Sequence, residues 1–270
     1  MATSLVISYP DIPFQSSYVA PSATYAEDTP SYNMIAGSRA SIAELSTAAA
    51  SANVIFSLGT TYATKGGKVD HVIIARADKL QTGTSSWTLA RGTDGSTFTT
   101  ETNDASFSSA TLYGPNSDDY VKDITLSSAF EWWKFTWTSG STSKFPTAKL
   151  YFGQWFDFGI EPDWYSMQRI PAKEATWYAG SGAYYSARLD VPIYRFTFRW
   201  EHVSDTLVNS FQTKLARNAY RCDFFLYTRV QHEVLGNQRL VNVRMTDWSI
   251  ENNEKSDWNT IEATFEEVLG

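Results

Sequence analysis

The segment Ile193–Trp200 alternates strictly between two kinds of side chain. Aromatic residues occupy every second position from Tyr194 to Trp200, and the positions between them hold Arg195, Thr197 and Arg199. A period of two places successive side chains on opposite faces of a β-strand. The segment is therefore predicted to be a strand with one buried aromatic face and one polar face, which requires a sheet and a partner layer.

Residues 52–158 are predicted to form a succession of short strands separated by turns. In Trp133–Trp137 the aromatic residues share one face, and Val69–Ala77 is apolar almost throughout, as in a strand buried on both faces. Thr93-Asp94-Gly95-Ser96 is a turn sequence, because glycine accepts positive φ. The expected strands are Asn53–Leu58, Val69–Ala77, Ser86–Arg91, Ala110–Tyr113, Tyr120–Leu126, Glu131–Thr138 and Ala148–Phe158. This succession predicts a β-sandwich or a jelly roll.

Residues 191–270 predict a different module. Ser204 is placed to cap a helix that runs to about Asn218, and an apolar stripe at helical spacing follows it. The stripe consists of Leu207, Val208, Phe211 and Leu215. Strands are then expected at Asp223–Thr228, Leu240–Asp247 and Asn259–Val268. The module is thus a strand, one helix and three further strands.

The remaining segments are predicted to be less regular. Residues 1–40 hold four prolines and are expected to be an extended arm with one short strand, Leu5–Tyr9. Ser41 and Glu44 fit a capping box, which predicts a short helix over 41–51 at the start of the unit 41–158. Residues 159–190 are rich in Trp, Tyr and Gly and are expected to be an irregular aromatic connector.

Composition narrows the function classes. The chain has 16 Phe, 15 Tyr and 10 Trp, which suits either a β-rich core or a large oligomeric contact. A net charge of −7 argues against specific nucleic-acid binding, which needs a basic face. Cys222 is the single cysteine, so no intrachain disulfide is expected. Neither a signal peptide nor a membrane span is predicted.

No pattern in the sequence predicts catalysis. His71, His202 and His232 are not spaced as metal ligands, and phosphate-binding, dinucleotide-binding and serine-hydrolase motifs are absent, so no cofactor, metal or catalytic residue is expected. Carbohydrate binding is a stronger candidate function than catalysis. Trp87, Asp94 and Tyr113 lie near predicted turns or strand ends and are the candidate carbohydrate-binding residues, although packing or solvated turns would explain each of them as well.

Residues 52–158 resemble a galactose-binding-like (discoidin-type) β-sandwich. The stretches that carry the resemblance are Asn53–Gly59, Val69–Asp78, Trp87–Phe98, Glu131–Trp137 and Ala148–Gly153, in the order found in that family. The resemblance implies the fold class, which is mainly β with a galactose-binding-like β-sandwich. It does not fix a ligand, because many such domains are structural.

Residues 184–270 resemble the C-terminal part of minor tail and distal-tail proteins of long-tailed phages. Tyr194–Trp200, the amphipathic helix, Cys222–Tyr227 and Trp258–Glu267 carry this resemblance. It implies a β-rich, ring-forming tail module with one α-helix, in a structural virion protein assembled in the host cytoplasm. Its implied partners are further copies in a hexamer or trimer, and tube and hub proteins at the distal tail or baseplate. A host glycan is a possible further partner.

The order of the two modules departs from that of typical distal-tail proteins, which place the ring-forming domain first. We expect Leu5–Tyr9 to join the module at 191–270, so that the sandwich is an insertion. Two rival functions remain open. One is a carbohydrate-binding protein that attaches to host surface glycan, and the other is a glycan-degrading enzyme.

Overall fold

The computed structural model describes residues 5–9, 19–21, 27, 43–57, 69–81, 83–113, 118–124, 130–146, 149–170, 174–178, 184–188, 193–219, 223–228, 240–252 and 258–268. The strands before residue 145 are β1 (Leu5–Tyr9), β2 (Val19–Pro21), β3 (Ala49–Ser57), β4 (His71–Ala75), β5 (Ser86–Gly92), β6 (Thr99–Asp104), β7 (Tyr120–Asp123) and β8 (Trp132–Ser143). The strands after it are β9 (Lys149–Phe156), β10 (Trp164–Ile170), β11 (Glu174–Tyr178), β12 (Tyr184–Arg188), β13 (Ile193–Val203), β14 (Asp223–Thr228), β15 (Leu240–Asn252) and β16 (Asn259–Glu267). The described residues include one α-helix, α2 (Asp205–Lys214), and short 3₁₀ turns at Ala77–Lys79, Phe107–Ser109 and Ala216–Asn218.

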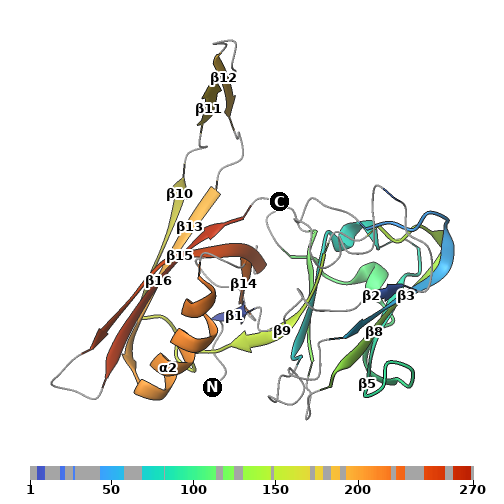
Figure 1. Ribbon diagram of the computed structural model, residues 1–270, viewed down its shortest axis with the longest axis horizontal. Helices are drawn as coiled ribbons and strands as arrows, with labels where there is room; N and C mark the ends of the chain where they lie inside the picture. Colours follow the sequence, from blue (N-terminus) through green and yellow to red (C-terminus); the bar gives the residue numbers. More distant parts are fainter. Residues whose placement is uncertain are drawn as a thin grey trace.

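Most of these strands belong to two sheets. A nine-stranded sheet has the order β10-β13-β16-β15-β14-β1-β9-β4-β7, and a five-stranded sheet has the order β2-β3-β8-β5-β6. Strands β11 and β12 form a separate hairpin. Figure 1 shows the five-stranded sheet at one end of the molecule, β10 and β13 at the other, and β1 and β9 between them.

The predicted β-sandwich is present. The five-stranded sheet packs on the β9-β4-β7 end of the nine-stranded sheet, and the two share one buried apolar cluster. As the period of two predicts, Trp133, Phe135 and Trp137 of β8 all point into this cluster. Val72 and Ile74 of β4 meet them from the other sheet.

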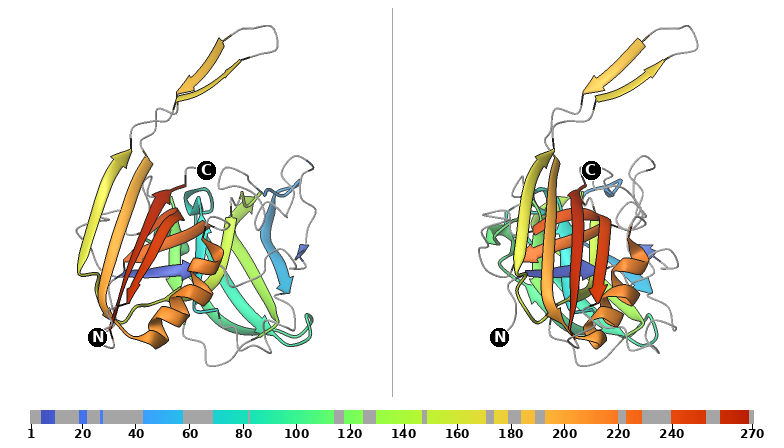
Figure 2. Two further views of the ribbon diagram at one scale, coloured as in Figure 1. Left: turned by 60° about the vertical axis from the view of Figure 1, so that its left-hand side comes forward. Right: turned by 90° about the vertical axis from the view of Figure 1, so that its left-hand side faces the viewer.

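The C-terminal half has a second core, with α2 covering one face of the sheet (Figure 2). The helix begins where the sequence predicts, because the Ser204 hydroxyl accepts a hydrogen bond from the Leu207 backbone N–H. Val208, Phe211 and Leu215 are buried in the same core as the aromatic residues of β13. The alternation in Ile193–Trp200 therefore does place its aromatic residues in a core.

Strand β1 joins the two halves. Leu5–Ser8 pair with β14, while Ile7–Tyr9 pair with β9, so β1 is hydrogen-bonded on both sides. Leu5 and Ile7 point into the second core. Val6 points to the opposite face, into a third cluster formed by residues from both halves.

The predicted helix over 41–51 is wrong for the residues that the structure describes. Ala43 and Leu45 form isolated β-bridges and are fully buried, and β3 already begins at Ala49. The Leu45 N–H donates to the Lys144 carbonyl, 2.9 Å away. Burial of two alternate apolar residues against the sandwich outweighs the local capping signal; Ser41 lies outside the described residues.

The stretch 159–190 is also more regular than expected. Strand β10 pairs with β13 along its whole length, from Trp164 opposite Arg199 to Ile170 opposite Ile193. The hairpin β11–β12 continues in the same direction and projects from the body of the molecule (Figures 1 and 2). Cross-strand pairing, which local composition does not reveal, gives this segment its order. Cys222 and His232 lie outside the described residues, as does most of the arm 1–40.

Substitution Ile7→Ala should destabilise the whole protein. Ile7 is 1% exposed in the second core, so the lost apolar contacts and the resulting cavity should lower the free energy of unfolding by about 2–5 kcal/mol. Urea denaturation followed by far-UV circular dichroism measures this. Ser141→Ala at an exposed position is the control and should change it by less than about 0.5 kcal/mol. An equally small effect of Ile7→Ala would show that β1 does not belong to this core.

Candidate functional site

Trp87, the first of the three predicted carbohydrate contacts, is a core residue. Its side chain is 1% exposed, stacks on Phe135 with ring centroids 5.3 Å apart, and meets Tyr120 edge-on at 5.8 Å. A ring buried in this way has no face to offer a sugar. The proximity of Trp87 to a strand end does not reveal which face of β5 it occupies.

Asp94 lies in the exposed turn between β5 and β6. Its Oδ1 atom accepts hydrogen bonds from the backbone N–H groups of Ser96 (2.9 Å) and Thr97 (2.7 Å). These bonds stabilise the carboxylate and lower the pKa of Asp94 to about 2. Asp94 thus holds the turn in place, together with the positive φ of Gly95.

Tyr113 packs beside a different cluster from the one that holds Trp87. It forms an isolated bridge with Asp119, and its ring meets Tyr227 edge-on at 6.1 Å, beside the third cluster. Trp87 and Asp94 are themselves separated by the length of β5, roughly 20 Å at the rise of an extended strand. The predicted residues therefore do not converge on one site.

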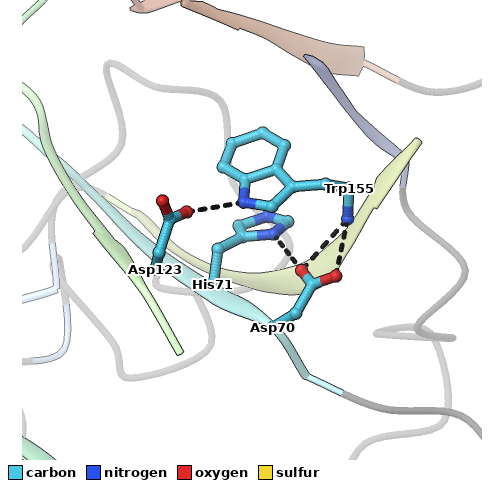
Figure 3. A network of polar contacts seen from close by, with 4 residues as sticks. All are labelled: Asp70, His71, Asp123 and Trp155. Atoms are coloured by element: carbon cyan, nitrogen blue, oxygen red, sulfur yellow. Dashed lines mark hydrogen bonds and ion pairs between the residues drawn. The ribbon is translucent and has the colours of Figure 1, made fainter. Parts of the chain in front are cut away.

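A polar network surrounds Trp155 where the two halves meet (Figure 3). The Trp155 indole stacks on His71 with centroids 3.8 Å apart and on Tyr227 of β14 at 5.4 Å. Its indole N–H donates to Asp123 (2.8 Å), and its backbone N–H donates to both oxygens of Asp70 (3.0 and 3.1 Å). The ring is thereby fixed between the sandwich and the C-terminal half.

His71 completes this network. Its Nδ1 donates to the Asp70 carboxylate, 2.9 Å away, and its side chain is fully buried. Burial lowers the pKa of His71, while the hydrogen bond to Asp70 and the charges of Asp70 and Asp123 oppose that shift. A buried imidazole stacked under an indole is screened from any dissolved substrate. The His71–Asp70 pair accordingly serves the joint rather than proton transfer.

A different place has the shape of a ligand site. A pocket of about 490 Å³ lies between α2 and the strands β15 and β16. Its lining residues are Asp205, Val208, Asn209, Gln212, Trp248, Ile250, Asn252 and Asn259. The volume falls within the usual range for small-molecule sites, roughly 300–1,000 Å³. Most of the polar lining consists of side-chain amides, and an indole forms part of the wall.

A second, open pocket of about 450 Å³ lies on the face of the sheet across β10, β13 and β16. Trp164, Arg199, Glu201 and Glu262 line it, and Arg199 forms an ion pair with Glu201 at 3.1 Å. Arg195, the next arginine along β13, donates to Glu266 at 3.1 Å. The arginines of β13 are thus paired with carboxylates. The polar face of this sheet therefore carries both positive and negative charges.

No helix among the described residues is both long and apolar enough to cross a bilayer. In the same part of the chain, no group of three or more His, Cys, Asp or Glu side chains is placed to hold a metal ion.

Comparison with known proteins gives similarities of fold in one half of the chain. No family model and no curated protein matches the sequence. CBM32-3 of a family 31 glycoside hydrolase from Clostridium perfringens is 13% identical, with a TM-score of 0.39, over 52% of this chain and 93% of its own.

Two other solved structures give similar values. The CBM32 of AlyQ, in complex with 4,5-unsaturated mannuronic acid, is 18% identical, with a TM-score of 0.39, over 54% of this chain and 96% of its own. The lectin domain of lectinolysin, complexed with Lewis B antigen, is 10% identical, with a TM-score of 0.38, over 54% of this chain and 98% of its own. These three neighbours are carbohydrate-binding domains and none is a tail protein. At such TM-scores the assignment of the sandwich rests on the strand pairing described above.

The pocket beside α2 was not foreseen from the sequence. One signal was available, because Asp205, Asn209 and Gln212 have the i, i+4, i+7 spacing that places polar side chains on one face of a helix. Nothing local to Trp248 indicates that it lies opposite that face.

The buried, neutral state of His71 predicts a pH dependence of stability. Because its folded pKa is lowered, the unfolded chain takes up a proton near about pH 6.5 while the folded chain does not. The free energy of unfolding should therefore fall as the pH decreases from about 7 to about 5. Urea denaturation at several pH values measures this slope. His71→Gln should flatten it and His202→Gln, at an exposed position, should not; equal slopes in all three proteins would contradict the assignment.

Proposed function

We propose that this protein binds carbohydrate without acting on it. The observation that carries the proposal is the pocket of about 490 Å³ beside α2, with its side-chain amides and the indole of Trp248. Amides both donate and accept hydrogen bonds, as sugar hydroxyls do. An indole offers a flat apolar surface with a polar N–H, which suits the apolar face of a pyranose ring.

The chemistry of the pocket supports binding rather than hydrolysis. Glycosidases in general place two carboxyl groups across the bond that breaks. Asp205 is the single carboxylate among the residues that line this pocket, and its Oδ1 accepts a hydrogen bond from the Asn259 amide at 2.8 Å. The pocket lacks the second acid that hydrolysis by this route requires.

A glycan array probed with the intact protein tests this function. We expect at least one oligosaccharide to be retained, and isothermal titration calorimetry should then give saturable binding. Prolonged incubation of the bound oligosaccharide should release no shorter product. Absence of binding to every glycan would overturn the proposal, and hydrolysis of any of them would overturn its non-catalytic part.

A second candidate function is structural, as part of an oligomeric ring at the distal end of a phage tail. The observation that favours it is the edge strand β10. Among the described residues, three of the four large exposed hydrophobic side chains lie on or just before this strand: Ile160, Trp164 and Met167, at 37%, 51% and 48% exposure. An exposed apolar edge is a template for pairing with another chain. The hairpin β11–β12 projects from the body of the molecule beyond β10 and β13 (Figure 2).

Substitution Trp164→Lys should weaken self-association. A charge at Trp164, the first residue of β10, opposes strand pairing along this edge, so oligomers seen by native mass spectrometry at micromolar concentration should shift toward monomers. Trp258→Lys is a matched control, because Trp258 is exposed to a similar extent, 49%, but lies immediately before β16. A strict monomer for the unaltered protein, or equal effects of both substitutions, would count against assembly through β10.

A further inference from the structure

The walls of the pocket beside α2 come from the helix and from the strands β15 and β16. Asp205, Asn209 and Gln212 lie on one face of the helix, at intervals of four and three residues. Opposite them, Trp248 and Asn252 belong to the second half of β15. The register of β15 against β16 shifts between Met245 and Asp247, which is a β-bulge. The extra residue turns Trp248 and Asn252 toward the helix rather than toward the polar face of the sheet.

Some polar side chains of the pocket are hydrogen-bonded within the protein and others are not. Asn259, 6% exposed, donates to the Val203 carbonyl at 3.2 Å and to Asp205 at 2.8 Å, and so fixes the end of the pocket near the start of α2. In the part of the chain that the structure describes, the side-chain amides of Asn209, Gln212 and Asn252 make no hydrogen bond. These three amides are exposed and available to a ligand.

The Trp248 ring is fixed in position by a contact with the second core. Trp248 is half-buried, and its ring meets Phe211 of the second core edge-on, with centroids 6.0 Å apart. Since Phe211 is fully buried, the position of Trp248 is set by the core. A ring fixed in this way presents its remaining surface to the pocket without loss of side-chain freedom on binding.

The charge of the pocket limits its ligand. Asp205 is the single ionisable residue in the lining, and Asn259 already satisfies one of its oxygens. No Lys or Arg lines the pocket, so an acidic sugar would gain no counter-charge there. A protonated amine would meet one partly engaged carboxylate. The surrounding amides favour a ligand that is uncharged and carries both donors and acceptors.

We infer that this pocket binds a neutral pyranose unit of a glycan, stacked on Trp248 and hydrogen-bonded by Asn209, Gln212 and Asn252. The inference rests on the proposed carbohydrate-binding function and places the site outside the β-sandwich.

The test uses the full chain and the double variant Asn209→Ala/Gln212→Ala. Both residues are exposed on a helix in which alanine is well tolerated, so the fold should be retained. Titration calorimetry with neutral gluco-, galacto- and manno-oligosaccharides should show at least one that binds, and the double variant should bind it about 10-fold more weakly or worse. Trp248→Phe, which preserves the contact with the core, should also weaken binding. Gln168→Ala removes an exposed amide of β10 and should leave binding within about two-fold.

Oligosaccharides of uronic acids and of glucosamine, titrated alongside, separate the remaining outcomes. If a neutral glycan binds equally well to the double variant, the protein binds carbohydrate at another site and the inference is overturned while the proposed function stands. If the charged oligosaccharides alone bind, the assignment of a neutral ligand is overturned. If no oligosaccharide of any kind binds, both this inference and the proposed function are overturned.

Discussion

Strand β1 is hydrogen-bonded to β14 on one side and to β9 on the other, and the architecture depends on this pairing. It makes one sheet from strands that would otherwise belong to two separate units. Because its side chains alternate, Ile7 supports the core beneath α2, while Val6 enters the cluster on the opposite face. A strand from the beginning of the chain thus completes a module built largely from its end.

Trp155 reinforces the same joint through contacts of another kind. Its ring stacks on His71 of the sandwich and on Tyr227 of the C-terminal half. Its two N–H groups donate to Asp70 and Asp123 (Figure 3). Aromatic stacking and charge-assisted hydrogen bonds act together here, which favours one relative orientation of the halves. The pocket beside α2 and the edge of β10 are consequently held at fixed positions relative to the sandwich.

The sequence predicted correctly those elements that are determined by short-range features, such as residue alternation and helix capping. The alternation in Ile193–Trp200 and the cap at Ser204 gave a strand and a helix that the structure contains. The predictions failed where distant contacts decide. Ala43 and Leu45 form isolated β-bridges, and the Leu45 N–H donates to the distant Lys144 carbonyl. Pairing with β13 orders β10, and the register of β5 with β8 turns Trp87 toward the core. The pocket could not be foreseen, because it requires both a bulge in β15 and the packing of α2 on the sheet.

Native-state hydrogen exchange of the backbone amides in β1 tests the central claim most directly. If β1 is an internal strand of the continuous sheet, those of its amides that donate to β14 or β9 should exchange as slowly as the amides of β14 and β15, through opening of the whole module. If β1 instead exchanges at the rate of an unstructured peptide while β14 and β15 stay protected, the two halves are not joined through this strand and the account is contradicted.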